Sequence, residues 1–409
     1  MAREMKDSGI EWIGKIPVDW NSCRLRYLCD IMTGNQDTQD NDPNGIYPFY
    51  VRSPKVEKSN KYTFEGKAIL MSGDGVGAGR IFHCVDGKYG CHQRVYSLQN
   101  INRVNFKYLF YYISNTFYVM IETANSKSTV DSVRLNMLQD FPVLVPRENE
   151  QHRIADFLDC KCAEIDRVLE KTSASIEEYK KLKKAVINKA VTRGIRGKRK
   201  LKDSRIDWIK QIPDEWNICN PKALFLQRKD KAKEGERQLT ASQNYGVVYQ
   251  DEYMEMTGQK VVTVEKDFSI LKHVEVGDFV ISMRSFQGGL EYSTKNGSIS
   301  SAYVMLIPNL EKVFPRFFRW LLKSSLYINA LQSTSDLVRD GQAMRYSNFT
   351  KVKLYTVPMD EQIEIANYLE KKCSEIDTLI YKKEQFITEL ESYKKSLIYE
   401  YVTGKKEVQ

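Results

Sequence analysis

EQHRIADFLDCKCAEID, at residues 150–166, is followed 211 positions later by EQIEIANYLEKKCSEID, at residues 361–377. The correspondence continues without a gap to Val191-Thr192 in the first copy and Val402-Thr403 in the second. A repeat of this length indicates that one structural unit is used twice in the chain. The fold class therefore depends on what this segment forms.

Each copy has the apolar spacing of one long helix. Apolar residues recur at alternating steps of three and four from Ile154 to Ala190, and again from Ile365 to Tyr401. This is a heptad pattern, and Lys and Glu fill the other positions. The first Gly or Pro in either copy is Gly194 or Gly404, where a helix stop is expected. We predict two rods of about 60 Å each, and the natural partner of each rod is the other copy.

A second repeat lies at the start of each globular block. DSGIEWIGKIPVDW, at residues 7–20, recurs 196 positions later as DSRIDWIKQIPDEW, at residues 203–216. The spacing between the two kinds of repeat is longer in the second half by a net fifteen residues, so the blocks have diverged while the rods match. We predict a globular block at 1–150, a rod with a basic linker at 151–202, a second block at 203–361 and a second rod at 362–409.

The globular blocks have the mixed pattern of an α/β or α+β fold. Residues 67–72 and 279–283 are predicted to be strands that lead into Gly-containing turns. Residues 106–113 and 317–322 are predicted to be buried helices. Each block ends in a β-like run into Val145-Pro146 or Val357-Pro358.

Composition excludes several classes of protein. Of the 409 residues, 42% are apolar and 28% are charged, which is typical of a folded globular chain. No apolar run reaches the roughly 18–20 residues that a membrane span needs, and the N-terminus has no signal-peptide pattern. The eight cysteines form no C-x-x-C pair, so free thiols in a reducing compartment are expected. We therefore expect a cytoplasmic protein without a membrane partner.

The net charge of +9 is concentrated in one short segment. Residues 193–202 contain six basic residues and no acidic residue. Such a segment attracts phosphate, but it can equally be a solvated linker. The basic residues are Arg193, Arg196, Lys198, Arg199, Lys200 and Lys202.

Two short patterns suggest ligand sites and are better explained otherwise. The glycines at 73–79 resemble a nucleotide-binding loop, but a strand-like run at 80–85 follows, so a hairpin loop is favoured. His83-Cys84 and Cys91-His92 flank Asp86-Gly87, so a hairpin there could gather zinc ligands. Because neighbouring strand residues point to opposite faces, ordinary strand positions are favoured and no metal site is predicted.

Catalytic motifs are not found in the sequence. It has no G-x-x-x-x-G-K-[ST] loop for ATP, no Asn-Pro-Pro-Tyr or Asp-Pro-Pro-Tyr, and only four histidines without a paired site. The expectation is a binding protein that is not an enzyme.

The duplicated pattern resembles the specificity subunit of type I restriction-modification systems. The resemblance is carried by the paired Ile-Pro openings at 16–17 and 212–213, and by Val-Pro, Glu-Gln, Ile-Ala and Glu-Ile-Asp in each half. Val402-Thr403-Gly404-Lys405 is also typical, whereas the first copy departs from it as Val191-Thr192-Arg193-Gly194. The resemblance covers essentially the whole chain.

The resemblance implies an architecture and a set of partners. Each block would be a target-recognition domain that reads one half of a bipartite site in double-stranded DNA. The rods would pack antiparallel with pseudo-twofold symmetry, set the half-site spacing and dock two modification (methyltransferase) subunits. Restriction (translocase) subunits would complete the complex. S-adenosylmethionine, ATP and Mg would bind to those partners and not to this chain.

Polar residues in predicted turns are the candidates for contact with bases, because Arg, Asn, Gln and Ser can hydrogen-bond base edges. An exposed polar loop residue without such a role is the alternative for each. In the first block the candidates are Asn35, Gln36, Arg80, Gln93, Arg94 and Arg134. In the second they are Gln243, Asn244, Arg284, Ser285, Gln287 and Arg345. Rival functions are a coiled-coil scaffold for protein partners and a nuclease with an unrecognised site.

Overall fold

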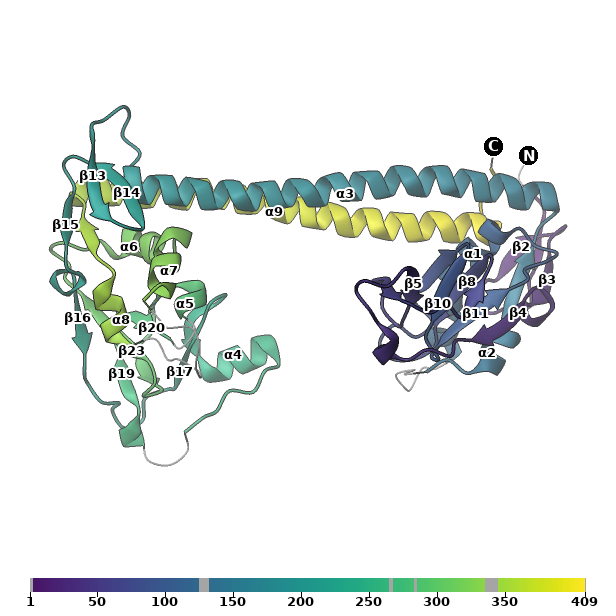
Figure 1. The fold of residues 1–409 in the computed structure, drawn as a ribbon, viewed down its shortest axis with the longest axis horizontal. Coiled ribbons are helices and arrows are strands. Elements are labelled where there is room, and N and C mark those ends of the chain that lie inside the picture. Colours follow the sequence, from purple (N-terminus) through teal and green to yellow (C-terminus); the bar gives the residue numbers. More distant parts are fainter. Residues whose placement is uncertain (1–2, 125–131, 265–267, 283–284, 335–344, 409) are drawn as a thin grey trace. The chain divides into compact units, whose positions relative to one another are not determined.

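Two long helices, α3 (Glu148–Arg193) and α9 (Met359–Val402), account for the repeated segments (Figure 1). The computed structural model describes residues 3–124, 132–264, 268–282, 285–334 and 345–408. Unit 1 contains Met1–Ser173 and Glu384–Gln409, and unit 2 contains Ala174–Lys383. Each unit therefore holds the start of one long helix and the end of the other.

The ends of both helices follow from their sequence. Acidic residues lie in the first turn of each, Glu148 and Glu150 in α3 and Asp360 and Glu361 in α9, where they complement the positive end of the helix dipole. Glycine with a positive φ follows each C-terminus, at 70° for residue 194 and 69° for residue 404. The predicted helix stops are confirmed.

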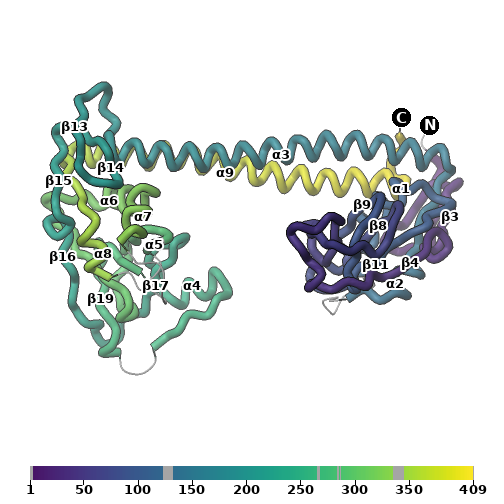
Figure 2. Tube along the Cα trace, in the orientation of Figure 1, coloured from purple at the N-terminus to yellow at the C-terminus, as the bar shows by residue number. Residues whose placement is uncertain are grey.

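Unit 1 shows how the two helices pair (Figure 2). Leu158 of α3 is buried in one core with Val402 of α9. The rings of Phe157 and Tyr401 lie 4.5 Å apart. Lys394 Nζ donates to Asp166 Oδ1 at 2.6 Å. Since residue numbers rise along α3 as those of their partners fall along α9, the helices are antiparallel.

Unit 2 repeats this pairing with equivalent residues. Val191 of α3 is buried with Leu369 and Cys373 of α9. Lys183 Nζ donates to Asp377 Oδ2 at 2.6 Å. Lys183 and Asp377 each lie 211 positions from Lys394 and Asp166, so the same ion pair is made twice. The predicted pairing of each rod with its own copy is confirmed.

The two sequence repeats meet at a buried joint in each unit. In unit 1, Trp20 Nε1 donates to Glu150 Oε2 at 2.9 Å, and Arg3 Nη1 donates to Glu150 Oε1 at 2.5 Å. In unit 2, Trp216 Nε1 donates to Glu361 Oε2 at 3.0 Å, and Arg199 donates to the same carboxylate. We call these contacts the Arg–Glu–Trp joints. They fix the opening of each block to the first turn of the following long helix.

Unit 1 contains two four-stranded sheets and two strand pairs. The sheets have the orders β4-β11-β8-β9 and β6-β5-β10-β7, and the pairs are β1-β2 and β12-β3. All strand pairs are antiparallel except β5-β10. The strands are β1 (Met5–Asp7), β2 (Lys15–Pro17), β3 (Asn21–Arg24), β4 (Asp30–Thr33), β5 (Tyr47–Tyr50), β6 (Glu57–Ser59), β7 (Phe64–Glu65), β8 (Ala68–Ser72), β9 (Phe82–Val85), β10 (Lys88–Cys91), β11 (Val95–Gln99) and β12 (Pro142–Val145). The shorter helices are α1 (Phe106–Ala124) and α2 (Leu135–Gln139).

The central strand β8 is buried on both faces, so its side chains divide between two cores. Ile69 and Met71 pack with Tyr112 and Phe117 of α1. The alternate residues, including Leu70, pack in a second core with Tyr89 of the other sheet. Alternation along a strand places successive side chains on opposite faces. The predicted strand and the predicted helix at 106–113 are confirmed.

Unit 2 is built around the sheet β16-β23-β20-β21, with four further strand pairs, β13-β14, β15-β24, β17-β18 and β19-β22. The strands are β13 (Leu201–Ile206), β14 (Ile209–Pro213), β15 (Asn217–Cys219), β16 (Phe225–Arg228), β17 (Leu239–Ser242), β18 (Gly246–Tyr249), β19 (Lys272–Val274), β20 (Phe279–Ile281), β21 (Glu291–Tyr292), β22 (Gly297–Ile299), β23 (Val304–Pro308) and β24 (Leu354–Thr356). The helices are α4 (Gln250–Thr257), α5 (Ser285–Gly288), α6 (Pro315–Leu322), α7 (Ser325–Gln332) and α8 (Tyr346–Lys351).

The core of unit 2 follows the same rule. Phe279 and Ile281 of β20 pack with Phe318 of α6, whereas Val280 packs in a separate core with Val274 and other residues. The predicted strand at 279–283 is confirmed for 279–281, and residue 283 lies outside the described residues. The predicted helix at 317–322 is the greater part of α6.

Both blocks are inserted between two paired strands. In unit 1, β3 pairs with β12, so residues 25–141 begin and end at neighbouring positions in the fold. In unit 2, β15 pairs with β24 around residues 220–353. The repeated sequences therefore form a common frame, and the divergent sequence lies between the paired strands.

The hairpin considered at Asp86-Gly87 does not form. Strand β9 pairs with β8 in one sheet, whereas β10 pairs with β5 and β7 in the other. His83 Nε2 lies 3.3 Å from Ser53 O, and His92 lies against Asp37. Within the described ranges, no group of three or more His, Cys, Asp and Glu residues is placed to hold a metal ion.

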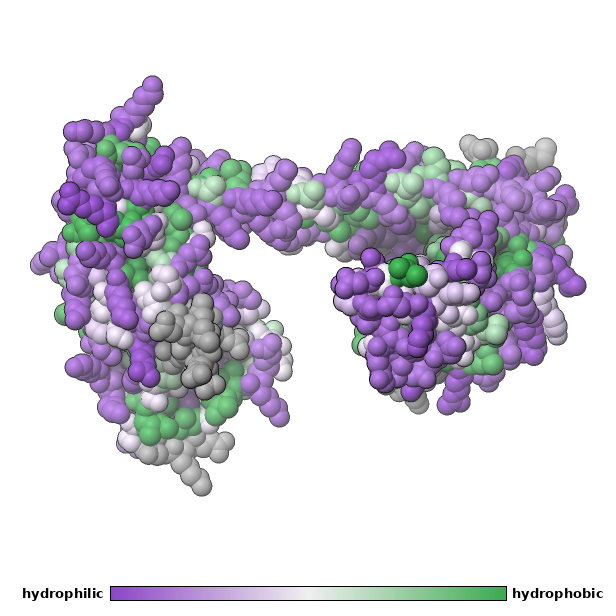
Figure 3. All heavy atoms as spheres, in the orientation of Figure 1, coloured by the Kyte–Doolittle hydropathy of each residue, from purple (hydrophilic) through white to green (hydrophobic). Residues whose placement is uncertain are grey.

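The surface seen in Figure 3 is mostly hydrophilic on both units, with hydrophobic side chains in small separate patches. None of the helices in the described part of the chain combines the length and apolar character that crossing a membrane requires.

Candidate nucleic-acid interface

The glycine-rich segment of unit 1 is the loop of a β8-β9 hairpin, as predicted. Gly73 N donates to Arg94 O at 2.9 Å, and Val133 N donates to Gly73 O at 2.7 Å. A Cβ on Gly73 would lie 2.9 Å from Arg94 O, so only glycine permits this approach. These contacts bring Gly73, Arg94 and Val133 together just after the end of β8.

Two arginines share one carboxylate at this place. Arg52 Nη1 donates to Asp74 Oδ1 at 2.6 Å, and Arg94 Nη1 donates to Asp74 Oδ2 at 2.8 Å. The Asp74 side chain is 16% exposed, whereas the arginine side chains are 46% and 59% exposed. We call these three residues the arginine cluster. The carboxylate orients both guanidinium groups and leaves much of their surface open.

The ionisation of Asp74 is controlled by opposing effects. Burial favours the neutral acid, but the hydrogen bonds and charges of Arg52 and Arg94 outweigh it and lower the pKa of Asp74. The carboxylate therefore remains charged at neutral pH, and the cluster carries a net charge of about +1 that can attract phosphate or a guanine edge.

Three further candidates lie on the adjoining turn. Gln36 is buried at 4% exposure, and its Nε2 donates to Lys61 O at 2.9 Å, so it ties the backbone together. Asn35 is exposed and accepts from Thr63 Oγ1 at 2.9 Å. Gln93 is exposed beside Arg94, whose backbone N–H donates to His92 Nδ1 at 3.0 Å. Asn35 and Gln93 remain available for contact, whereas Gln36 is structural.

Arg80 and Arg134 have different surroundings. The guanidinium of Arg80 lies 3.8 Å from the centre of the Tyr118 ring on α1. It lines a hollow of about 800 Å³ together with Lys395 and Tyr399 of α9, so it faces the helices and not the arginine cluster. Arg134 is exposed at the start of α2, directly after the residues that contact Gly73.

In unit 2 the turn between β17 and β18 carries two candidates. Gln243 and Asn244 are exposed and line a hollow of about 620 Å³ whose walls include Tyr253, Gln259 and Lys260. Most of this lining is polar, with amide and hydroxyl groups that can donate and accept hydrogen bonds. The hollow therefore offers a varied hydrogen-bonding surface where unit 1 offers exposed arginines.

An ion pair with a buried carboxylate supports this turn. Lys323 Nζ donates to Gln243 O at 3.3 Å and to Glu291 Oε2 at 2.7 Å. Glu291 is 4% exposed, and burial raises its pKa above the usual value although Lys323 opposes the shift. The pair fixes the backbone of the turn that bears Gln243.

The remaining candidates of unit 2 are dispersed. Ser285 is buried, and its Oγ accepts from Ser282 N at 2.8 Å, so it has a structural role. Gln287 is exposed on α5, and Arg345 is exposed at the start of α8. Arg284 lies outside the described residues.

Sequence reasoning missed charged residues that lie at the same places. Arg52 follows β5 in a turn before Pro54, which is a recognisable signal for an exposed loop arginine. In unit 2, Arg237 and Lys295 lie 3.7 Å and 4.3 Å from the centre of the Tyr249 ring, in loop segments far apart in sequence. No local pattern in the sequence indicates that second arrangement.

The basic segment after α3 is largely paired with acids of unit 2. Arg196 Nη2 donates to Asp360 Oδ2 at 2.6 Å and to Glu364 Oε1 at 2.8 Å. Arg199 contacts Glu361 and also donates to Glu215 Oε2 at 2.9 Å. These two arginines are thus neither a phosphate site nor a free linker, because they tie the end of α3 to the start of α9.

Comparison with known proteins finds similar domains and chains. Residues 17–178 match the model of the type I restriction modification DNA specificity domain. The type I restriction enzyme EcoDI specificity subunit of Escherichia coli is 24% identical over 391 residues, which cover 90% of this chain and 84% of that protein. The type I restriction enzyme MjaVIII specificity subunit of Methanocaldococcus jannaschii is 21% identical over 426 residues, covering 97% and 95%.

Solved structures share the fold. One, from a study of complex assembly and conformational transition of the type I R-M system, has a TM-score of 0.68 at 14% identity and covers 96% of this chain and all of that one. The HsdS subunit from Thermoanaerobacter tengcongensis has a TM-score of 0.50 at 14% identity, with 96% and 98% covered. Residues 17–178 thus match a type I DNA specificity domain, and the chain is similar over nearly its whole length to specificity subunits of type I restriction enzymes.

Proposed function

We propose that this chain recognises a bipartite DNA sequence for a type I restriction-modification complex, with each block reading one half of the target. The observation that carries the proposal is the pair of divergent blocks held by equivalent Arg–Glu–Trp joints. Equivalent frames give both blocks the same attachment, while the sequence between the paired strands is free to differ. A reader of two unlike half-sites needs both properties.

In unit 1 the arginine cluster is the proposed centre of base recognition. An arginine can donate two parallel hydrogen bonds to O6 and N7 of guanine, which is the commonest specific contact in the major groove. Asp74 holds Arg52 and Arg94 in place, so less side-chain freedom is lost on binding. Asn35, Gln93 and Arg134 would extend this surface.

In unit 2 the β17-β18 turn is the proposed centre. Asn and Gln can bind N6 and N7 of adenine through two hydrogen bonds, so Gln243 and Asn244 suit an adenine. The Lys323–Glu291 pair would keep their turn in register. The two units would thus prefer different bases, because one presents guanidinium groups and the other presents amides.

The reactions of the complex would take place on other subunits. We propose that the long helices dock two modification subunits, which bind S-adenosylmethionine, and that restriction subunits supply ATP- and Mg-dependent translocation and cleavage. The chain itself would supply neither methyl transfer nor cleavage. Its contribution is affinity and choice of sequence.

Exchange of one block tests the proposal. We would replace residues 25–141 with the corresponding block of another specificity subunit, which preserves β3, β12 and the unit 1 joint. The hybrid, assembled with its modification subunits, would be assayed by methylation of a library of randomised sites. One half-site should change and the other should persist. A change in both halves, or none, would disprove separate reading.

A second assay separates the rival functions. The purified chain alone would be incubated with duplex DNA, with and without divalent metal. Salt-dependent binding without cleavage is expected, since contacts to phosphate release counterions. Metal-dependent cleavage would support a nuclease, and absence of any DNA binding by the chain or its complex would support a scaffold.

A further inference from the structure

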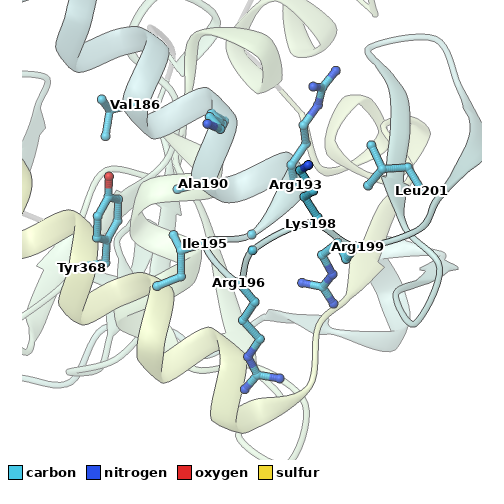
Figure 4. Close-up of a pocket in the computed structure, with 12 residues that line it drawn as sticks. Val186, Ala190, Arg193, Ile195, Arg196, Lys198, Arg199, Leu201 and Tyr368 are labelled. Carbon is cyan, nitrogen blue, oxygen red and sulfur yellow. The ribbon is translucent and has the colours of Figure 1, made fainter.

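A hollow of about 480 Å³ lies at the C-terminal end of α3 in unit 2 (Figure 4). Val186 and Ala190 of α3, Ile195 of the following segment and Tyr368 of α9 form its apolar floor. Figure 4 shows the Tyr368 ring standing across from Val186, with the 194–199 segment closing one side. This volume is within the range of protein pockets that hold a ligand or a side chain.

The equivalent place in unit 1 is filled. Phe157 stands 211 positions before Tyr368, and Tyr401 stands 211 positions after Ala190. The rings of Phe157 and Tyr401 pack 4.5 Å apart. Alanine in place of tyrosine therefore leaves open in unit 2 the space that an aromatic ring occupies in unit 1.

The charges around the two places also differ. Lys189 replaces the residue equivalent to Glu400, which in unit 1 pairs with Lys406. Lys189, Arg193 and Lys198 line the hollow and are exposed. These three residues form no ion pair with any other residue that the structure describes. The hollow thus has an apolar floor and an unbalanced positive rim.

We propose that this hollow is a docking site for an acidic segment of a modification subunit, which inserts one aromatic side chain against Tyr368. The inference rests on the proposed function. The Phe157–Tyr401 contact within the same protein shows the chemistry of the occupant, and the basic rim selects acidic neighbours. An aromatic side chain in a partner's pocket is a frequent centre of binding energy.

The occupant is protein and not DNA. A phosphate or a base edge loses hydrogen bonds to water when it is buried, and an apolar floor cannot replace them. Since the rings of Phe157 and Tyr401 fill the equivalent place in unit 1, the two modification subunits dock unequally. One of the two binding events depends on the aromatic side chain inserted against Tyr368, and the other does not.

Three variants of the full chain test this. Ala190→Tyr fills the hollow with the residue found at position 401. Tyr368→Ala removes the ring from the floor of the hollow. Because Tyr368 is 39% exposed, folding should tolerate this change. The double variant Lys189→Glu/Lys198→Glu reverses the rim. Ala174→Tyr is the matched control, because it adds the same ring at an exposed alanine of α3 outside the hollow.

The probe is the purified modification subunit of the same system, titrated calorimetrically onto each variant. We expect two binding events with the wild-type chain and with Ala174→Tyr. Each test variant should weaken one event by about tenfold or more and leave the other unchanged. Unchanged binding in Tyr368→Ala and in the double variant would overturn the docking site even if Ala190→Tyr failed to fold.

Two other results have distinct meanings. If the wild-type chain bound no modification subunit, the proposed function would fail and the docking site with it. If Lys189→Glu/Lys198→Glu weakened binding of duplex DNA by the chain alone but left subunit binding intact, the hollow would belong to the DNA surface and the docking proposal would be wrong.

Discussion

The two globular blocks differ where the two frames agree. The block of unit 1 presents exposed guanidinium groups oriented by Asp74, and the block of unit 2 presents amides around a polar hollow. The frames repeat the same buried joint, the same inter-helix ion pair and the same glycine stop. In the joints, where a buried carboxylate is paired, the two copies have the same residues. In the blocks, the exposed polar side chains differ.

The largest expected effect is on the joints. Glu361 is fully buried, whereas the Glu150 side chain is 10% exposed. Glu361→Ala would leave Arg199 and the Trp216 N–H without their partner, which should destabilise unit 2 by about 3–5 kcal/mol. Glu150→Ala should cost unit 1 less, because Arg3 is more exposed than Arg199 and can rehydrate. Urea unfolding monitored by tryptophan fluorescence would measure both.

A control distinguishes the joint from any loss of a carboxylate on α9. Glu364→Ala removes a partner of Arg196 at the surface of the same helix and should leave the unfolding transition nearly unchanged. Equal destabilisation by Glu361→Ala and Glu364→Ala would show that burial of the joint does not determine its contribution.

The next largest effect is expected on the affinity of each block for its preferred DNA sequence. Arg94→Ala should weaken binding to the preferred half-site of unit 1 by about 1–3 kcal/mol and relax one base position. Gln243→Ala should do the same for the other half-site only. Binding of the assembled complex to libraries randomised in one half-site at a time would show this. Loss of affinity spread evenly over all sequences would mean that Arg94 contacts phosphate.

Substitution of the two glycines that end the long helices should give a smaller difference in stability between the units. Gly194 and Gly404 both adopt the left-handed conformation, which costs a non-glycine residue roughly 1–2 kcal/mol. An added Cβ would press on the Glu361 carboxylate in one case and on the Pro17 ring in the other. Gly194→Ala should therefore disturb the unit 2 joint directly and cost more than Gly404→Ala. A larger cost for Gly404→Ala in thermal unfolding would reverse this ranking.

Asp74 should give the arginine cluster a defined pH dependence. Its pKa is lowered in the folded chain, so its contribution to stability is complete above the unfolded value of about 4 and is lost as pH falls through the folded value. The stability difference between the wild type and Asp74→Asn should thus be constant from pH 5 to 8 and shrink below pH 4. A difference that varied between pH 6 and 8 would assign it to another group.

Much of the frame was predictable from the sequence, because repeats and heptads are local patterns. The helix pairing, the stops at Gly194 and Gly404 and the central strand of each block were all expected. The joints were not, since Arg3 carries no signal of its own and meets Glu150 only in the folded chain. Gln36 and Ser285 resembled turn residues but are buried, and Arg196 resembled a linker residue but is paired across to α9.

The smallest expected effect tests whether the two ends of the helix pair are energetically equivalent. Lys394–Asp166 and Lys183–Asp377 are the same ion pair made twice, with aspartates 56% and 54% exposed and lysines 26% and 27% exposed. Exposed pairs contribute about 0.2–1 kcal/mol and weaken with salt. Double-mutant cycles at each pair should therefore give coupling energies that agree within about 0.3–0.5 kcal/mol and fall together as salt is raised. If only one pair lost its coupling energy in high salt, the local environments of the two ends would differ, and the frame would be less symmetrical than its sequence.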